Sequence, residues 1–352
     1  MKFLISAYTG LGNFILKTPL IRAIHEQFPN VEVDLLCGCP WGAEEVLQHS
    51  KWINHIYWYP PKKGISQKIY MLKALRSVKY DVVFFPFDST PKFMRFTAFL
   101  LNAKKIISHL NLNNQSKGGN LRSTFSILFG LNTSFVPILT GRHESELNLD
   151  LLEPLLTTPA ERNLQTFVHW KKEKLPFNLP DNYIVLQLAA RNGSPTPKTW
   201  DPQNFFEIIT RWQKDHPKDF FVLVGDKGDA EFLLNMPILK TGIINLLGMT
   251  NFNQLCNVIN DSKIVISHDS GVMHLANALQ IPLIALYGPT DFTRTAPLNS
   301  ASHIIQSRNE CWARMYSFRE SEDDLANQYE DYYCMSSISV DSVLCKMSEC
   351  TS

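Results

Sequence analysis

The sequence carries no marked excess of charge of either sign. Its 34 lysines and arginines are balanced by 33 aspartates and glutamates, which leaves a formal net charge of +1 at pH 7. Proteins that bind nucleic acid need a basic surface, because neutralising phosphates supplies most of their nonspecific affinity. The near-neutral balance therefore predicts that nucleic acid is not a partner.

The chain also lacks a long apolar run. No window approaches the roughly 18 uninterrupted apolar residues that suggest a membrane-spanning helix. The first residues contain one early lysine, Lys2, but no apolar stretch long enough for a signal peptide. These absences predict a cytoplasmic protein, and they leave open a peripheral contact with the inner face of the membrane.

Cysteines are few, and they are not spaced as metal ligands. Seven are present, and four of them, Cys311, Cys334, Cys345 and Cys350, crowd into the last segment at spacings unlike the close pairs of a zinc site. A reducing compartment would leave this odd set as thiols. We therefore expect neither a disulfide nor a metal centre.

The length and the alternation of the sequence predict two α/β domains. With 352 residues, the chain exceeds the size of about 250 to 300 residues at which a single core stops growing. Near-continuous apolar runs separated by helical patterns indicate parallel sheets covered on both faces. The expected strands of the first half are 2–7, 31–36, 53–58, 82–86 and 105–108, and its expected helices are 14–28, 41–48, 66–78 and 92–101.

Turn and breaker residues, among them Pro159, Pro176 and Pro180, interrupt this pattern. A second series of the same kind follows them. Its expected strands are 183–188, 220–224, 264–267 and 283–286, and its expected helices are 202–214, 251–260 and 272–279. The resulting organisation is an N-terminal domain at 1–156, a linker region at 157–180, a C-terminal domain at 181–306 and a tail at 307–352.

The most informative stretch is a turn that follows the apolar run 264–266. Asp269 or Ser270 can accept hydrogen bonds from the first turn of the next helix, and Gly271 lets a ligand approach the backbone. Such a helix start favours anions, and His274 lies on the same face as Ser270. On its own, a turn of this kind is more often a plain helix cap, and a single histidine at this spacing is usually structural.

The complete string resembles the signature of glycosyltransferase family 9, the heptosyltransferase family of bacterial lipopolysaccharide assembly. That signature is Asp-Ser/Thr-Gly-x-x-His-Leu-x-x-Ala, then Pro, then Tyr/Phe-Gly-Pro-Thr, and every one of its positions is filled here. Other segments resemble the family's remaining elements in the expected order. These are the glycine loop at 10–20, a His-Glu element at 143–144 with Asn-Leu at 148–149, and Lys-Thr-Trp at 198–200.

The resemblance implies an α/β fold of the GT-B type, in which two doubly wound parallel-sheet domains face each other across a cleft. In that architecture the first domain binds the acceptor, the second binds the nucleotide sugar, and the tail packs back on the first domain. The implied activity is inverting, metal-independent transfer of a sugar, with heptose from ADP-heptose expected, onto a lipopolysaccharide core or another surface glycan. No cofactor is implied. A different nucleotide sugar, or a degenerate protein that binds without turnover, remain as alternatives.

Donor-binding residues are expected at the carboxyl ends of the strands in the second domain, where ligands of open parallel sheets bind. A departing nucleoside diphosphate gains charge, which fixed donors stabilise. Thr196, Lys198, Ser270 and Gly271 supply such a set. A solvated loop lysine remains the alternative for Lys198, which stands beside two prolines.

The donor's ribose and base have their own candidates. Asp226 and Asp229 follow a strand, where a carboxylate can accept from ribose hydroxyls. Acids near a helix start are also ordinary partners of the helix dipole. Met249 resembles the family residue that packs on the base.

On the acceptor side, where the glycine loop contributes Gly10 and Gly12, the chain departs from the family. Many members carry an aspartate after this loop, which is thought to take the proton of the attacking hydroxyl. Here the residue is Asn13, and an amide cannot act as a general base near neutral pH. Three hypotheses follow: Asp88 is the base while Asn13 orients the acceptor, transfer proceeds with little base assistance, or there is no turnover. Asn13 also fits a cap for the helix from Phe14.

Two remaining features have competing explanations. Arg122 and Arg142 could bind acceptor phosphates or carboxylates bidentately, and a surface salt bridge explains each equally well. The glycine loop also begins like a dinucleotide-binding fingerprint. Its third glycine position is Ile15, so an NAD-dependent oxidoreductase is rejected.

Overall fold

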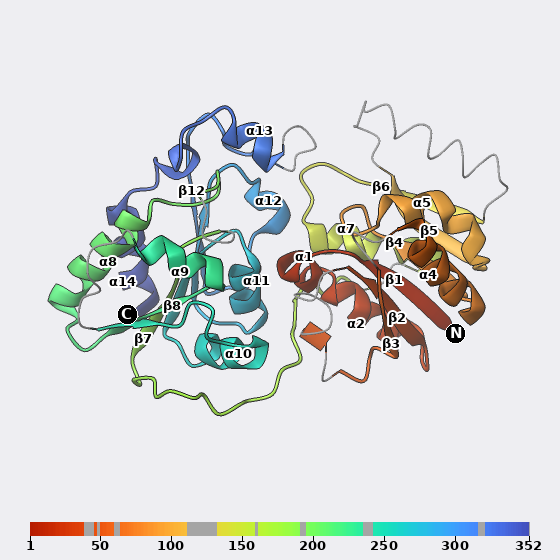
Figure 1. Cartoon of the computed structure of the whole chain (residues 1–352), viewed down its shortest axis with the longest axis horizontal. Helices are drawn as coiled ribbons and strands as arrows, with labels where there is room; N and C mark the ends of the chain where they lie inside the picture. Colours follow the sequence, from red (N-terminus) through yellow and green to blue (C-terminus); the bar gives the residue numbers. More distant parts are fainter. Residues whose placement is uncertain are drawn as a thin grey trace. The chain divides into compact units, whose positions relative to one another are not determined.

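Parallel sheets organise both of the units into which the chain divides, Met1–His169 and Trp170–Ser352 (Figure 1). The computed structural model describes residues 1–38, 46–47, 50–59, 64–110, 132–158, 161–190, 195–234, 242–315 and 321–351. The division between the units falls inside the range 157–180, where the breaker residues lie.

The sheet of the first unit has six strands in the order β3-β2-β1-β4-β5-β6, and every neighbouring pair is parallel. The strands are β1 (Lys2–Ala7), β2 (Glu32–Cys37), β3 (His55–Trp58), β4 (Val82–Phe85), β5 (Lys105–Leu110) and β6 (Thr133–Pro137). Its helices are α1 (Leu11–Ile15), α2 (Thr18–Gln27), α4 (Ile65–Val78), α5 (Lys92–Thr97) and α7 (Glu144–Asp150), with short 3₁₀ turns η1 (Ala98–Leu101) and η2 (Glu153–Leu155). The strand order reverses between β1 and β4, and ligands of doubly wound sheets bind at such a reversal.

The region predicted as one helix at 14–28 is instead two helices. Helix α1 begins at Leu11, and α2 begins at Thr18 with Pro19 in its first turn. Proline is accommodated there because the N–H it lacks has no intrahelical partner at that position. Most of the predicted helix 41–48 lies outside the described residues, and β6, a partly exposed edge strand, was not predicted.

The sheet of the second unit repeats the same plan in the order β12-β11-β10-β7-β8-β9. Its strands are β7 (Tyr183–Gln187), β8 (Phe220–Val224), β9 (Ile243–Asn245), β10 (Ile264–His268), β11 (Leu283–Tyr287) and β12 (Ser302–Gln306). Its helices are α8 (Pro202–Asp215), α9 (Lys227–Leu234), α10 (Phe252–Asn260), α11 (Gly271–Ala278), α12 (Phe292–Thr295), α13 (Glu322–Ala326) and α14 (Val340–Thr351), with the 3₁₀ turn η3 (Tyr333–Met335). Here the order reverses between β7 and β10.

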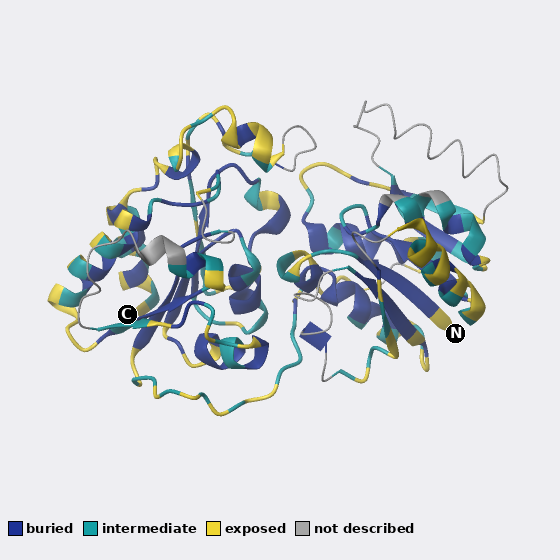
Figure 2. Cartoon of the chain, viewed as in Figure 1, coloured by how far each residue is buried: buried dark blue, intermediate teal, exposed yellow. Residues whose placement is uncertain are grey.

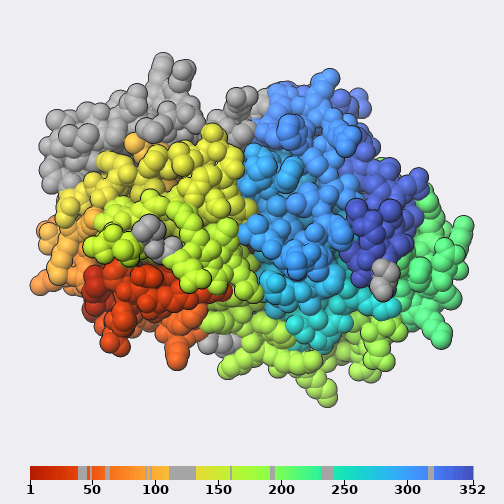
Figure 3. Space-filling view, turned by 180° about the vertical axis from the view of Figure 1, so that it is seen from behind, coloured from red at the N-terminus to blue at the C-terminus, as the bar shows by residue number. Residues whose placement is uncertain are grey.

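The tail contributes to the core of the second unit. Ile338, Val343 and Met347 are buried in one cluster with Trp200 and with residues of α8. In Figure 2, the strands of both sheets are largely dark blue, the colour of buried residues. The indole N–H of Trp200 also donates to the carbonyl of Ile338 over 3.1 Å. Figure 3 shows the last residues, in dark blue, beside the green residues of the same unit. The apolar face of α14 thus covers part of its own unit's sheet.

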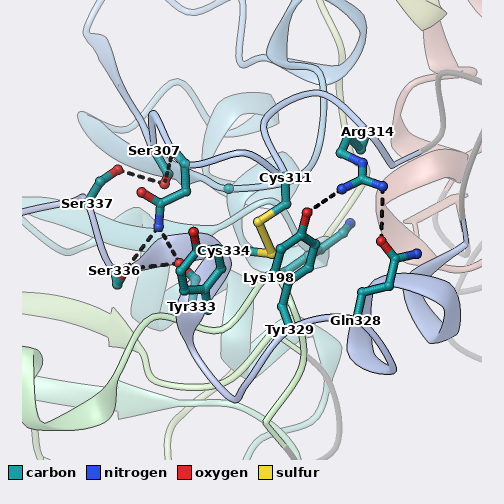
Figure 4. The surroundings of a disulfide bond; sticks show 12 residues. Lys198, Ser307, Cys311, Arg314, Gln328, Tyr329, Tyr333, Cys334, Ser336 and Ser337 are labelled. Atoms are coloured by element: carbon teal, nitrogen blue, oxygen red, sulfur yellow. Dashed lines mark hydrogen bonds between the residues drawn. A yellow bond between two sulfur atoms is a disulfide. The ribbon is translucent and has the colours of Figure 1, made fainter.

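The cysteine prediction is also corrected. Cys311 and Cys334, which are 23 positions apart, form a disulfide with a Cα–Cα distance of 5.6 Å (Figure 4). Both lie buried in a small cluster with Met315 and Leu325. Their spacing in the sequence could not reveal this proximity, which folding of the segment after β12 creates. In the chain-entropy model, closing a loop of this size stabilises the fold by about 3 kcal/mol.

Candidate functional site

The reversal of strand order in the second unit brings two distant loops together. The loop after β7 carries Lys198, and the turn after β10 carries Asp269. Their side chains form an ion pair with 2.8 Å between Nζ and Oδ2, and only 14% and 7% of these side chains are exposed. The sequence therefore places a shielded cation beside the N-terminus of α11, at the edge where ligands of such sheets bind.

The N-terminus of α11 is not closed by its own cap residue. Ser270 occupies the N-cap position but makes no capping hydrogen bond; its hydroxyl donates instead to Oε1 of Gln187 over 2.6 Å. Ser267 donates to the same oxygen, also over 2.6 Å. Ser270, one of the two residues expected to accept from this turn, therefore does not do so. Within the described residues, no side chain of the cap residue occupies the N–H groups at the start of α11, and such groups can bind an anion.

The charges around Asp269 hold it ionised. Although burial alone would raise the pKa of the Asp269 carboxyl, the charge of Lys198, assisted by His274, lowers that pKa below its ordinary value. Nε2 of His274 lies 3.8 Å from Oδ1 of Asp269, and His274 is 3% exposed. The hydroxyl of Thr295 is a further neighbour of Oδ1, at 3.3 Å. The ionised carboxylate of Asp269 thus holds the ammonium of Lys198 in position.

His268 fixes the loop that carries Lys198. Burial lowers the pKa of His268 to about 3, so the ring is neutral near pH 7. Its Nε2 accepts the backbone N–H of Trp200 over 3.0 Å. Thr196 holds the other side of the same loop, because its hydroxyl accepts the N–H of Lys198 over 3.2 Å. Sequence reasoning missed His268 and Gln187, since each acts through a partner about 70 to 80 positions away.

The two aspartates after β8 differ in their surroundings. Asp229 is 3% exposed, and its carboxylate accepts the N–H of Asp226 over 3.0 Å. Asp226 is exposed, and its Oδ1 accepts the N–H groups of Gly228 and Asp229 at the start of α9. Both carboxylates thus accept backbone N–H groups at or just before the start of α9. Asp226 is the better placed of the two to reach a ligand.

Met249 follows a turn that only glycine can form. Gly248 has φ +66, and a Cβ there would lie 2.9 Å from the backbone of Lys227. This turn leaves Met249 57% exposed beside the loop that carries Asp226. An exposed methionine is an adaptable apolar surface for a flat ring.

In the first unit, the reversal between β1 and β4 creates a second polar centre. Nζ of Lys17, whose side chain is fully buried, lies 2.6 Å from Oδ2 of Asp88. The same ammonium donates to the carbonyl of Asn13 over 3.1 Å. Within the described residues, Oδ1 of Asp88 is buried without a hydrogen-bond partner. An acceptor atom left in this state can take a proton donor from a ligand.

Asn13 is not the helix cap that was one of its explanations. Helix α1 begins at Leu11, and its N-cap is Gly10, so Gly12 and Asn13 lie inside the helix. A Cβ at Gly10 would meet no atom within 4 Å, which leaves open space above the loop.

A neutral histidine lies behind this centre. Burial lowers the pKa of His109 to about 4. Its Nδ1 accepts the N–H of Phe87 over 3.2 Å, so its Nε2 carries the proton that is donated to the carbonyl of Leu147 over 2.8 Å. His109 therefore anchors the loop that carries Asp88.

Of the two arginines expected to bind the acceptor, Arg142 and Arg122, the structure describes only Arg142. Arg142 is bound to Asp150, with 2.6 Å between Nη1 and Oδ2, and to Glu146 over 3.0 Å. Arg162 shares Asp150 over 2.8 Å. The salt bridge is thus the explanation found for Arg142, while Arg122 lies outside the described residues.

In the part of the chain that the structure describes, no three histidine, cysteine, aspartate or glutamate side chains gather as they would to hold a metal ion. None of the helices described combines the length and the hydropathy that a membrane-spanning segment needs.

Comparisons with known proteins agree with this geometry. The model of glycosyltransferase family 9 (heptosyltransferase) matches residues 71–317. The chain is 44% identical over 325 residues to lipooligosaccharide heptosyltransferase 2 of Haemophilus influenzae, covering 87% of this chain and 88% of that one.

Solved structures share the fold. The glycosyl transferase family 9 protein from Veillonella parvula superposes with a TM-score of 0.77 at 18% identity, covering 99% of this chain and 97% of that one. The Escherichia coli heptosyltransferase WaaC, solved with ADP, superposes with a TM-score of 0.68 at 16% identity, covering 99% and 100%. The α/β prediction of two doubly wound parallel-sheet domains of the GT-B type is confirmed.

Proposed function

Because this chain belongs to glycosyltransferase family 9, the heptosyltransferase family, we propose that it transfers heptose from ADP-heptose to a lipopolysaccharide-core acceptor. The proposal extends to a single displacement that inverts the anomeric centre and needs no metal ion or other cofactor. The protein would work in the cytoplasm, at or near the inner face of the membrane. The observation that carries it is the ion pair of Lys198 and Asp269 beside the uncapped start of α11.

The donor's diphosphate would bind at this helix start. The first-turn N–H groups supply fixed donors, and Lys198 supplies a positive charge in a shielded place. Charge develops on the diphosphate as the bond between it and the anomeric carbon breaks, so these groups stabilise the transition state more than the bound donor. The Ser270 hydroxyl donates to Gln187 in this structure and would turn to donate to a phosphate oxygen when the nucleotide sugar binds.

The nucleoside would extend toward the loops after β8 and β9. Exposed Asp226 is our candidate for the ribose hydroxyls, and exposed Met249 for the flat face of the base. That the Escherichia coli heptosyltransferase WaaC was solved with ADP supports adenine as the base.

On the acceptor side, Asp88 would take the proton of the attacking hydroxyl. Its Oδ1 is buried without a partner, while Lys17 holds its other oxygen in place. The hydroxyl oxygen then bonds to the anomeric carbon, ADP departs, and the proton remains on Asp88. Asn13, in the adjacent helix α1, would orient the acceptor, with Gly10 and Gly12 giving it room.

A panel of nucleotides tests the donor site. A ligand at 100 times its Kd stabilises the fold by about 2.7 kcal/mol, so ADP and ADP-heptose should raise the melting temperature of the purified protein. UDP and GDP sugars should leave it unchanged. A shift with UDP or GDP sugars would overturn the ADP-heptose assignment but leave a glycosyltransferase, and no shift with any nucleotide would contradict the donor site.

A further inference from the structure

The disulfide between Cys311 and Cys334 joins two segments that follow β12. We call these two segments together the disulfide lobe: residues 307–315 and residues 328–338. Side chains also cross between them, since the guanidinium of Arg314 donates to the hydroxyl of Tyr329 and, over 3.0 Å, to Oε1 of Gln328 (Figure 4). The disulfide is thus the covalent part of a contact that holds the two segments together.

One side of the disulfide lobe holds the loop between β11 and α12. The backbone N–H of Met315 donates to the carbonyl of Pro289 over 2.9 Å. A Cβ at Gly288 would lie 3.1 Å from the carbonyl oxygen of Cys334 and closer still to Sδ of Met335. The lobe therefore lies directly against this loop, with contacts from both of its segments.

The disulfide lobe also supports both members of the ion pair at the donor site. The loop just described leads into α12, whose last residue, Thr295, donates its hydroxyl to Oδ1 of Asp269 over 3.3 Å. Trp200 stands two positions after Lys198, and its indole N–H donates to the carbonyl of Ile338 in the lobe over 3.1 Å. The lobe thus contacts the supports of Asp269 on one side and of Lys198 on the other.

The disulfide lies where a local opening can expose it. Cys311 and Cys334 are buried in a small cluster, apart from the large cluster that contains Trp200. Their neighbours in the chain, Trp312 and Tyr333, are 50% and 37% exposed. A region with few buried apolar contacts opens at a lower free energy than the core of the unit. A reductant can therefore reach the bond without unfolding the second unit.

We propose that this disulfide is a reversible redox switch that controls donor binding by the second unit. A cellular dithiol reduces it: one thiolate attacks one of the two sulfur atoms, the S–S bond breaks, and the second thiol releases the mixed disulfide. Two electrons and two protons pass to the protein, and the dithiol becomes a disulfide. The two segments then separate, and the loop before α12 and Trp200 lose their support. The inference rests on the proposed donor site and on the proposed cytoplasmic location, where disulfides are usually transient or redox-sensing.

The oxidised and reduced forms of the full-length protein test the proposal, with dithiothreitol as the reductant. Mass spectrometry after thiol alkylation should find Cys311 bonded to Cys334 before reduction and both as thiols after it. Reduction should raise the Kd of ADP, measured by calorimetry, about tenfold, a common size for coupling between two sites. It should also speed amide hydrogen exchange in the segments 287–295 and 198–200, because their supports are released.

Two variants complete the experiment. Cys311→Ser with Cys334→Ser should bind ADP as weakly as the reduced wild type and should not respond to dithiothreitol. Cys345→Ser removes an exposed cysteine of α14 and should keep the full response. The reduced wild type gives the same comparison as the double variant without any substitution.

The proposal and the donor site on which it rests fail in different ways. Thiols at both positions in the oxidised protein, or equal Kd values for ADP in the two forms, would overturn the switch. Equal hydrogen exchange in the two forms would also overturn it, and this measurement needs no nucleotide. Absence of ADP binding in the oxidised protein would instead contradict the proposed donor site.

Discussion

Replacing Lys198 with methionine should lower kcat/KM for sugar transfer by about 10² to 10³, because it removes a fixed positive donor from a shielded site. The thermal shift produced by ADP should shrink in the same variant. Transfer rates and ADP-induced melting shifts, measured with the wild type and Lys214→Met as controls, check both effects.

In the Lys198→Met variant, a loss of folding stability has to be distinguished from a loss of transfer activity. Lys198→Met leaves the buried Asp269 without its main counter-charge, and breaking a buried pair in this way costs about 3 to 5 kcal/mol. The double variant Lys198→Met with Asp269→Asn removes both charges and should recover most of that stability while staying inactive. A stable double variant with nearly wild-type kcat/KM would show that Lys198 is a structural lysine.

Replacing Asp88 with asparagine should lower kcat by about 10² to 10⁴, the usual contribution of a general base. This outcome is measured by initial rates at saturating donor and acceptor.

Because Asp88 is paired with Lys17, the Asp88→Asn variant also needs a double variant as its control. Lys17 is fully buried, so Asp88→Asn alone leaves an unpaired ammonium inside the fold. Lys17→Met with Asp88→Asn removes both charges and should fold but remain slow. Asn13→Asp distinguishes the hypotheses: with Asp88 as base it brings no gain, whereas a marked gain in turnover would mean that the natural site works without base assistance.

The sequence predicted the local elements of the fold better than their partners. The strand, turn and helix around Asp269, and the strand before the glycine loop, follow from short-range pattern and were found in place. The pairs that define the two centres, Lys198 with Asp269 and Lys17 with Asp88, each join positions 71 residues apart. Only the reversal of strand order in each sheet brings them together.

The errors have the same physical origin. The spacing of Cys311 and Cys334 in the sequence could not show that the segment after β12 brings them together in a disulfide. Ser270 has the right chemistry for a cap, and Gln187, 83 positions away, takes its hydroxyl instead. Capping rules consider only residues that are close in sequence. They cannot predict that an acceptor from another strand takes the hydroxyl of the cap residue.

Sugar transfer by the purified protein tests the proposed activity. Purified enzyme, ADP-heptose and a lipopolysaccharide-core acceptor are incubated with excess EDTA, and the acceptor is followed by mass spectrometry and by NMR of the new linkage. We expect addition of heptose, release of ADP and an anomeric configuration opposite to that of the donor. Binding of ADP-heptose without any transfer to core acceptors, with or without added metal ions, would contradict it and leave a nucleotide-sugar-binding protein.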